Sequence, residues 1–410
     1  MNDVVPVDAT VWTRPEVRRT PAPFRTFLRL AAGEWAIGTF EIVTPDGKKL
    51  LIRGRDPGPA GVLQVKDYRF VGRVMAGGDI GFAEGYMAGE WDTPDLSSLL
   101  TVLSLNYDRI RRLAAGNPVV RAFNRLVHAV RKNSRAGSRR NIHAHYDLGN
   151  QFYEKWLDRT MTYSSARHET PGQELSAAQL NKYRTLARCM DLKPGQHVLE
   201  IGCGWGGFAE FAAREIGARV TGITISREQF DYARKRLFRE GLNEQAEIRL
   251  VDYRDVEGTY DRVASIEMFE AVGEEYWPTY FGKVHDVLRP GGRAGLQIIT
   301  IQDEQFDTYR RRTDFIQKYI FPGGVLPSEA SLRPVIERAS LEWASISRFG
   351  QAYADTLAEW GQRFQAAWGE IRPLGFDERF RKLWAFYLGY CEAGFRTGRT
   401  DVVQLELRRA

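Results

Sequence analysis

The chain of 410 residues is 43% hydrophobic and 27% charged, which is typical of a globular protein with space for one large domain and a smaller one. It contains no run of about 18 apolar residues and no apolar segment near its start, so we expect neither a transmembrane helix nor a secretory signal. The net charge of +6 indicates anionic partners, and the three cysteines have neither metal-ligand spacing nor a disulfide pattern, so no metal site is predicted.

Residues 1–131 are predicted to form a small N-terminal domain that mixes strands with helices. Residues 33–40 and 49–53 have the composition of strands, and a Pro-Asp-Gly turn lies between them. Residues 77–81 are rich in glycine and predict a loop. Asp95 is expected to cap the start of the helix that follows it.

A strongly basic stretch follows. Residues 108–140 contain ten lysines and arginines against one acid, and apolar residues recur there at helical spacing. A basic amphipathic helix is typical of a protein that binds an anionic membrane surface, although a solvated helix packed on its own protein has the same pattern. Residues 132–141 are polar and predict a linker. The sequence therefore predicts a cytoplasmic protein, peripheral on the inner membrane face, whose catalytic domain spans residues 142–410.

From residue 177 onwards, apolar runs alternate with helical patterns, which predicts an α/β sheet of the Rossmann-like kind. The C-terminal part is predicted to be helical and rich in aromatic residues, and to end in a strand. The expected strands are 197–201, 219–225, 246–251, 262–266, 293–301 and 401–408, and the expected helices are 208–216, 227–240 and those within 353–394.

A glycine-rich loop after the first of these strands predicts a nucleotide-type cofactor site. Gly202, Gly204 and Gly206 let the backbone turn tightly and approach a ligand at a helix N-terminus. The loop is shorter than the dinucleotide fingerprint, and no acid ends the second strand where an NAD ribose partner would stand. Thr224 and Gln229 stand there instead and can bond ribose hydroxyls or a methionine part.

After the third strand, Asp252, Tyr253 and Arg254 are placed to reach an adenine edge. The alternative is that the glycines only form a tight strand–helix turn. Polar residues at three neighbouring strand ends favour the cofactor site.

These residues lie in a series of motifs that resembles the cyclopropane-fatty-acyl-phospholipid synthase family, which includes mycolic acid cyclopropane and methyl transferases. The similarity covers about residue 67 to the end, including the bacterial N-terminal segment 78–87. HYDLGN and KYIFPGG are its most specific motifs. The motifs are HYDLGN at 145–150, LDRTMTYS at 157–164, VLEIGCGWG at 198–206, TISREQ at 224–229, MFE at 268–270 and KYIFPGG at 318–324.

The resemblance implies S-adenosylmethionine (SAM) bound to a class I methyltransferase sheet, helices that cap a hydrophobic acyl slot, and a homodimer. It also implies that the N-terminal domain, residues 1–131, handles lipid. Pattern and resemblance together predict cofactor contacts at Tyr163, Ser164, Gly202, Cys203, Gly204, Gly206, Thr224, Gln229, Asp252, Tyr253 and Arg254. The predicted acyl-pocket residues are Phe269, Ile299 and Tyr319.

The implied chemistry is transfer of a methyl group to the double bond of an unsaturated phospholipid acyl chain, which leaves a carbocation on the chain. Phe269, Glu270 and Tyr353 are candidates to stabilise this cation. If the next proton leaves from the new methyl group, a cyclopropane forms. If it leaves from the neighbouring chain carbon, a methyl-branched alkene forms.

The predicted catalytic residues are Glu270, Tyr353, Gln297 and Ser165, and the sequence departs from the family at the last two. In the family a bicarbonate ion serves as base, in a cradle that resembles Glu270, Tyr353 and the backbone at Ile299. Ser165 and Gln297 replace a cysteine and a histidine of that cradle, and either can still hydrogen-bond an anion. Two alternatives stay open: the enzyme retains bicarbonate as its base, or the base lies elsewhere. The substitutions favour the methyl-branched product.

Three neighbouring features remain open. Glu267 is predicted either to touch cofactor or substrate or to cap the loop after the fourth strand. Ala271 stands where the family has histidine. His143 and His145 are expected to be structural rather than general bases.

Two other functions are compatible with parts of the sequence. A SAM-dependent methyltransferase of a small non-lipid substrate would share the catalytic domain, but the N-terminal segment and the basic stretch argue against it. Nucleic acid would also suit the positive charge. The sequence lacks an RNA-binding signature and stacking aromatics among the basic residues, so no nucleic-acid partner is expected.

Overall fold

The computed structural model describes residues 4–7, 15–110 and 148–410. Outside these ranges lie the predicted linker at 132–141, most of the basic stretch, His143 and His145. What the sequence predicts for them, and for the domain boundaries, remains a prediction. Within the described ranges, none of the helices is both long and apolar enough to span a membrane.

The N-terminal part is built on a five-stranded sheet in the order β1-β3-β2-β4-β5. Buried and partly buried residues alternate along β2 and β3, as they do in strands with one covered face. The strands are β1 (Val4–Pro6), β2 (Ile37–Val43), β3 (Lys49–Arg53), β4 (Asp56–Val65) and β5 (Trp91–Asp92). The helices are α1 (Pro15–Arg18), α2 (Ala22–Gly33), α3 (Arg69–Gly77), α4 (Asp79–Met87) and α5 (Leu96–Leu105).

The local predictions for this part were partly correct. Asp95 caps α5 by accepting the Ser98 N–H at 3.0 Å, as expected. The loop predicted at 77–81 is shorter than expected, because Gly78 alone, with φ of 62°, separates α3 from α4. Gly81 lies inside α4, where a Cβ atom would sit 1.9 Å from the Arg73 carbonyl oxygen, so glycine here permits close packing of α3 on α4.

The catalytic part contains a seven-stranded sheet in the order β11-β12-β10-β9-β6-β7-β8. Five strands, from β8 to β10, are parallel, and β12 pairs antiparallel with both β10 and β11 at one side. The strands are β6 (His197–Ile201), β7 (Arg219–Thr224), β8 (Ala246–Leu250), β9 (Tyr260–Ile266), β10 (Leu288–Ile301), β11 (Leu341–Arg348) and β12 (Thr400–Arg409). This arrangement confirms the predicted α/β sheet.

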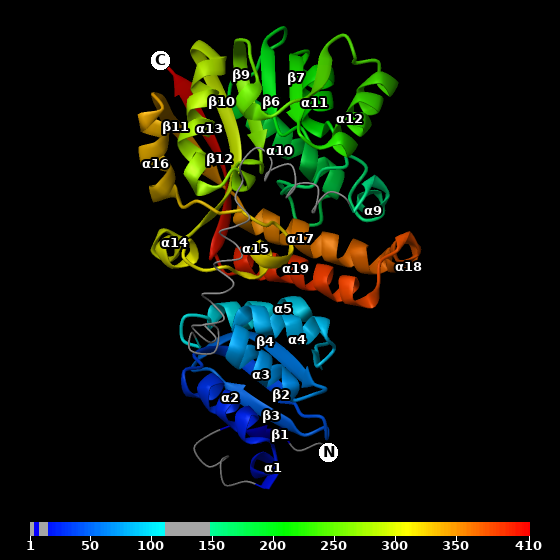
Figure 1. Cartoon of the computed structure of the whole chain (residues 1–410), viewed down its shortest axis with the longest axis vertical. Helices are drawn as coiled ribbons and strands as arrows, with labels where there is room; N and C mark the ends of the chain where they lie inside the picture. The colour runs from blue at the N-terminus through cyan, green and yellow to red at the C-terminus, as the bar shows by residue number, and fades with distance from the viewer. Residues whose placement is uncertain (1–3, 8–14, 111–147) are drawn as a thin grey trace.

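Helices cover both faces of this sheet (Figure 1). They are α9 (Asn150–Glu154), α10 (Leu175–Cys189), α11 (Gly207–Phe211), which continues as a π-helical turn (Ala212–Ile216), α12 (Arg227–Arg239), α13 (Trp277–Val287), α14 (Asp303–Tyr309), α15 (Phe315–Tyr319) and α16 (Glu329–Arg338). Short 3-10 turns occupy Tyr253–Asp255, Phe269–Ala271, Glu274–Tyr276 and Arg372–Leu374.

Three further helices form a cap: α17 (Gly350–Ala366), α18 (Trp368–Ile371) and α19 (Glu378–Arg396). Figure 1 shows α17 and α19 side by side between the catalytic sheet and the N-terminal part. Trp360 and Trp384 are fully buried in this cap. Phe386 in α19 faces the N-terminal residues Tyr86 and Trp91, with ring centroids 6.0 and 6.5 Å away. The helical, aromatic-rich C-terminal region is therefore confirmed, and it joins the two parts.

A polar contact also joins the two parts. Glu84 in α4 accepts hydrogen bonds from Lys318 at 2.8 Å and from the Tyr319 hydroxyl at 2.6 Å. Both partners belong to the KYIFPGG motif at the end of α15. The N-terminal part thus anchors one of the most specific motifs of the catalytic part.

Candidate active site

The glycine loop follows β6 at the carboxyl edge of the sheet. Gly202, Gly204 and Gly206 have φ of 82°, 51° and 84°, a left-handed conformation that favours glycine. At Gly202, a Cβ atom would also lie 2.6 Å from the Met268 side chain. The loop therefore needs glycine both for its turn and for its close approach to the segment after β9.

The residues after β7 form the second side of this site. Ser226 caps α12 by accepting the Gln229 N–H at 3.3 Å, and the Thr224 hydroxyl donates to the Gln229 side-chain oxygen at 2.8 Å. These bonds fix two polar side chains at the strand end that the sequence predicted. Thr224 and Gln229 both border the cavity described below.

The third side lies after β8. The Asp252 carboxylate accepts two bonds from the Arg254 guanidinium, at 2.8 and 2.6 Å, so this charge pair neutralises itself. The Tyr253 hydroxyl and one Glu200 oxygen are buried, border the cavity, and lack a hydrogen-bond partner among the described residues. Polar groups left unsatisfied beside a glycine loop fit a ligand with hydroxyl and amine groups, such as SAM.

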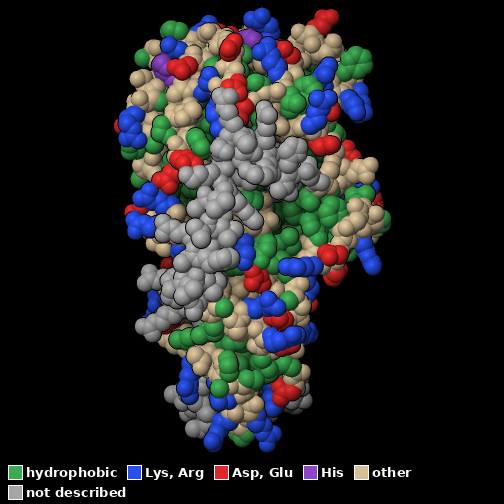
Figure 2. All heavy atoms as spheres, viewed as in Figure 1, with side chains coloured by type: hydrophobic (Ala, Val, Ile, Leu, Met, Phe, Trp, Pro, Cys, Tyr) green, Lys and Arg blue, Asp and Glu red, His purple; other side chains and the backbone are tan. Residues whose placement is uncertain are grey.

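One cavity of about 620 Å³ begins at this glycine loop and continues into the molecule. It passes Glu267, Glu270 and Tyr353, then the aromatic residues of α19, and reaches Phe82 and Leu100 in the N-terminal part. Figure 2 shows hydrophobic side chains gathered on one face where the two parts meet. A single space thus joins a polar pocket to an apolar one.

Most of the predicted site residues border this cavity: Tyr163, Ser164, Gly202, Cys203, Gly204, Thr224, Gln229, Asp252, Tyr253, Arg254, Glu270, Ile299 and Tyr353. Five others do not. Gly206 turns away into the start of α11. Phe269 packs against Trp277 and Tyr280 in the core on the other side of its turn. The Tyr319 hydroxyl is bound to Glu84. Ser165 and Gln297 do not border the cavity, and both donate hydrogen bonds to the Glu267 carboxylate.

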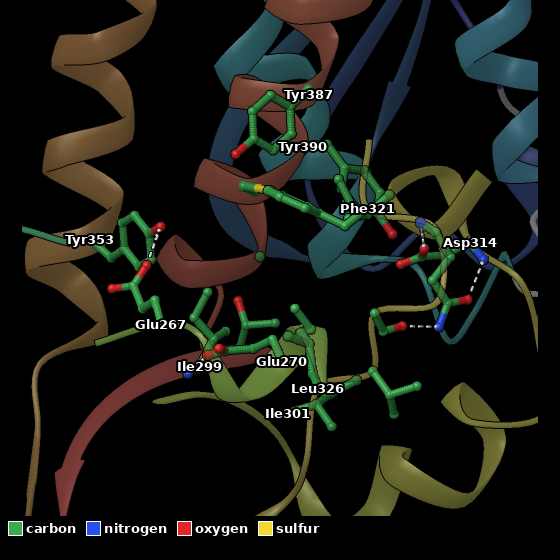
Figure 3. Close-up of a pocket in the computed structure, with 18 of the residues that line it drawn as sticks. Glu267, Glu270, Ile299, Ile301, Asp314, Phe321, Leu326, Tyr353, Tyr387 and Tyr390 are labelled. Atoms are coloured by element: carbon green, nitrogen blue, oxygen red, sulfur yellow. Dashed lines mark hydrogen bonds between the residues drawn. The ribbon is translucent and has the colours of Figure 1, made fainter. Parts of the chain in front are cut away.

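Glu267, the first residue after β9, gathers polar residues around its carboxylate. Its Oε1 atom accepts the Ser165 N–H at 2.8 Å and a Gln297 side-chain N–H at 2.7 Å. Its Oε2 atom accepts the Tyr353 hydroxyl at 2.7 Å, as Figure 3 shows. Ser165, Gln297 and Tyr353, predicted to hold a bound anion together with Glu270, therefore surround the carboxylate of the chain itself.

Glu270 has a different environment three residues later. Its Oε1 atom accepts the Ile299 N–H at 2.5 Å, and its Oε2 atom is buried with no described partner. Burial, and then the nearby Glu267, raise the pKa of Glu270 to about 8. Tyr353, predicted to join Glu270 in a cradle, instead donates to Glu267.

Lys182, a fully buried lysine in α10, was not predicted from the sequence as part of the site. Its ammonium donates to the Ser164 hydroxyl at 2.6 Å. Burial lowers the pKa of Lys182, and the Glu267 carboxylate opposes that shift. Burial likewise raises the pKa of Glu267, which the Lys182 ammonium and the three hydrogen bonds oppose. The only sequence signal was its place on the face of α10 that also carries Gln179, Tyr183 and Leu186.

No cluster of metal-binding side chains occurs in the described part of the chain. The site therefore consists of a glycine loop, polar strand ends, two buried carboxyl groups and an apolar extension.

Comparisons with known proteins point to one family. Residues 133–405 match the family model described as mycolic acid cyclopropane synthetase. The chain is 42% identical over 347 residues to the tuberculostearic acid methyltransferase UfaA1 of Mycobacterium tuberculosis, covering 82% of this chain and 80% of that protein. It is 34% identical over 354 residues to the cyclopropane-fatty-acyl-phospholipid synthase of Escherichia coli K12, covering 85% and 87%.

Solved structures give the same result. The mycolic acid cyclopropane synthase CmaA1, complexed with SAH and CTAB, is similar with a TM-score of 0.62 and 28% identity, covering 66% of this chain and 98% of that one. The cyclopropane synthase MmaA2 from Mycobacterium tuberculosis has the same TM-score, identity and coverage.

Proposed function

Since the chain belongs to the mycolic acid cyclopropane synthetase family and is a SAM-dependent methyltransferase with the Rossmann-like class I fold, we propose that it methylates the double bond of an unsaturated phospholipid acyl chain. Two relatives support this substrate by their names, a tuberculostearic acid methyltransferase and a cyclopropane-fatty-acyl-phospholipid synthase. These proteins cover most of the chain, including its N-terminal part.

The observation that carries the proposal is the continuous cavity. Its polar end fits SAM, and its other end is lined by apolar and aromatic side chains from both parts of the molecule, among them Phe82, Leu100, Phe321 and Phe386. A small hydrophilic substrate would leave this apolar length unused. An acyl chain fills it and places a carbon–carbon bond near the glycine loop.

The residues around the reacting carbons suit a cationic intermediate. Bound SAM supplies an electrophilic methyl group to this space. Tyr353, Tyr387 and Phe321 border the same stretch of the cavity and present aromatic faces to a developing positive charge (Figure 3). The Glu270 oxygen that has no hydrogen-bond partner among the described residues is buried, and a buried carboxylate stabilises a nearby cation strongly. A nearby positive charge also favours the ionised form of Glu270.

We propose the methyl-branched alkene as product, with the cyclopropane as the alternative. The support lies in the departures at Ser165 and Gln297, which change the group available to accept the proton. We also propose that the enzyme works as a homodimer on the surface of an anionic membrane, peripheral on its inner face, as the positive net charge suggests.

A labelled donor tests the function. Purified protein is incubated with liposomes of unsaturated phosphatidylglycerol and SAM that carries a trideuterated methyl group. The fatty acids are then analysed by gas chromatography and mass spectrometry. A branched product should retain three deuterons, and a cyclopropane only two, because ring closure removes a proton from the methyl group.

Liposomes with only saturated chains are the control and should gain no label. Transfer to small amines, with no label in unsaturated lipid, would contradict the proposed substrate.

A further inference from the structure

We infer that the Glu267 carboxylate is the base that removes the proton after methyl transfer, so that the enzyme carries its base in its own chain. This inference rests on the proposed C-methylation of an alkene. It follows from the position of Glu267 in the cavity wall, from its hydrogen bonds and from its backbone conformation.

The reaction needs a proton acceptor inside a closed apolar cavity. The alkene electron pair forms a bond to the methyl carbon, and the sulfur–carbon bond breaks with its electron pair left on sulfur. The neighbouring chain carbon becomes a cation. A C–H bond next to it must then break, its electron pair forming the new double bond and its proton moving to a base. No oxidant or reductant takes part.

Few described groups can serve as that base. No histidine is among the described residues that border the cavity. Asp252 is bound to Arg254 at the cofactor end. Glu270 accepts one backbone N–H and is assigned to the developing cation, so it is the weaker candidate for the base. Glu267 is the remaining carboxyl group beside Tyr353 and Glu270.

The hydrogen bonds of Glu267 leave it one place for a proton. Each carboxylate oxygen can accept two bonds. Oε1 receives the N–H groups of Ser165 and Gln297 and is full, whereas among the described residues Oε2 receives only the Tyr353 hydroxyl. The three donors orient the carboxylate, and the Lys182 ammonium opposes the rise in its pKa that burial causes. One lone pair of Oε2 remains to accept a proton.

The backbone at Glu267 supports a functional role independently. Its φ is 49°, a left-handed conformation that a residue with a long side chain rarely adopts. Its N–H donates to the Gln297 carbonyl at 2.8 Å, which fixes this conformation next to the glycine loop. Strained residues of this kind persist where the surrounding structure holds them for function. Here the strained backbone directs the carboxylate into the cavity wall.

Two variants test the inference. Glu267→Gln keeps the shape of the side chain but removes its basicity, and it should lower turnover by about 100-fold or more, the usual contribution of a general base. Glu267→Gly removes the carboxylate and suits the positive φ, so this variant should fold and bind S-adenosylhomocysteine (SAH) with the affinity of the wild type. It leaves the donors of Ser165, Gln297 and Tyr353 around an empty space.

Chemical rescue separates a base from a structural residue. Added formate or bicarbonate should restore turnover to Glu267→Gly in a saturable way, while the wild type should be fully active in buffer stripped of carbon dioxide. Glu337→Gln is the matched control, because Glu337 is exposed on α16 and is not among the residues that border the cavity. It should keep wild-type turnover.

The outcomes are distinct. A wild type that methylates no unsaturated lipid overturns both the proposed function and this inference. An active wild type with a Glu267→Gln variant within about threefold of it overturns the inference alone. So does a wild type that requires added bicarbonate, or a Glu267→Gly variant that binds SAH, loses turnover and regains none with either anion.

Discussion

At the scale of single residues, Glu267 and Glu270 lie three positions apart but differ in the hydrogen-bond donors around their carboxyl groups. Glu267 receives three hydrogen bonds and lies near a buried ammonium, whereas Glu270 receives one and has a free oxygen. Environments that separate the acidities of two neighbouring acids are a common way to assign them different tasks. We expect Glu267 to take the proton and Glu270 to face the cation.

The replacement Glu270→Gln should lower kcat by about 100-fold, because it removes a charge aimed at the developing cation. The ionised form of Glu270 is the active one, and its pKa is raised to about 8, so turnover of the wild type should rise as the pH increases towards that value. The positive sulfonium lowers this pKa, so in the complex the rise lies at lower pH. Rates measured from pH 5 to 9 should show no such rise for the Glu270→Gln variant.

Calorimetric titration with SAH provides the control for Glu270→Gln, because the affinity should stay within about threefold of the wild type. An equal loss of SAH binding would place Glu270 with the cofactor instead.

Lys182→Met tests the buried ammonium. Removing it leaves Glu267 buried without its countercharge, so the free energy of unfolding should fall by roughly 3 kcal/mol, as when one partner of a buried pair is removed. Thermal or urea unfolding measures this loss. The double variant with Glu267→Gln should recover part of the stability. Equal losses in the single and double variants would show that the two side chains do not interact.

At the scale of elements, strands with alternating or fully apolar patterns were predicted well from the sequence, and those containing proline and glycine were not. β6, β7, β9 and β12 lie close to their expected bounds. β4, which contains Pro57 and Pro59, was not predicted, although the strand pairs with β2. Edge strand β11 lacks a continuous apolar pattern.

Prediction of the site from the sequence was limited in the same way. Its glycine loop and strand ends depend on local sequence and were predicted. The Glu267 cluster joins residues more than 100 positions apart, which no local pattern reveals.

Gly202→Ala tests the turn after β6. The new methyl group would lie 2.6 Å from the Met268 side chain on a backbone with φ of 82°. We expect a loss of about 1–3 kcal/mol in stability from strain and at least tenfold weaker SAH binding. Gly282→Ala, in an open position of α13, is the matched control: it should leave SAH affinity unchanged and should not lower stability, because alanine favours a helix over glycine. Normal binding by Gly202→Ala would show that the loop can shift without cost.

At the scale of the whole molecule, the two sheets share one cavity and one set of contacts through α19. The link from Glu84 to Lys318 and Tyr319 holds the segment that carries Phe321, which borders the acyl end of that cavity. The N-terminal part is thus a wall of the acyl site as well as an attached domain.

Glu84→Ala should therefore raise the KM for lipid several-fold and leave SAH affinity unchanged, because it frees the segment that borders the acyl end only. Steady-state kinetics with liposomes measure this. Glu41→Ala, which breaks the pair with Lys49 within the N-terminal sheet, is the control and should leave KM unchanged. A similar rise in both variants would point to general loosening of the N-terminal part.

The position of β12 affects how the molecule is made. This strand, Thr400–Arg409, lies between β10 and β11 rather than at a border of the sheet. During synthesis, β10 and β11 leave the ribosome long before the strand that separates them, and their free edges stay exposed until residue 409 emerges. A nascent chain is therefore open to non-native pairing or to chaperones during this interval. Deleting these ten residues would split the catalytic sheet rather than trim its end.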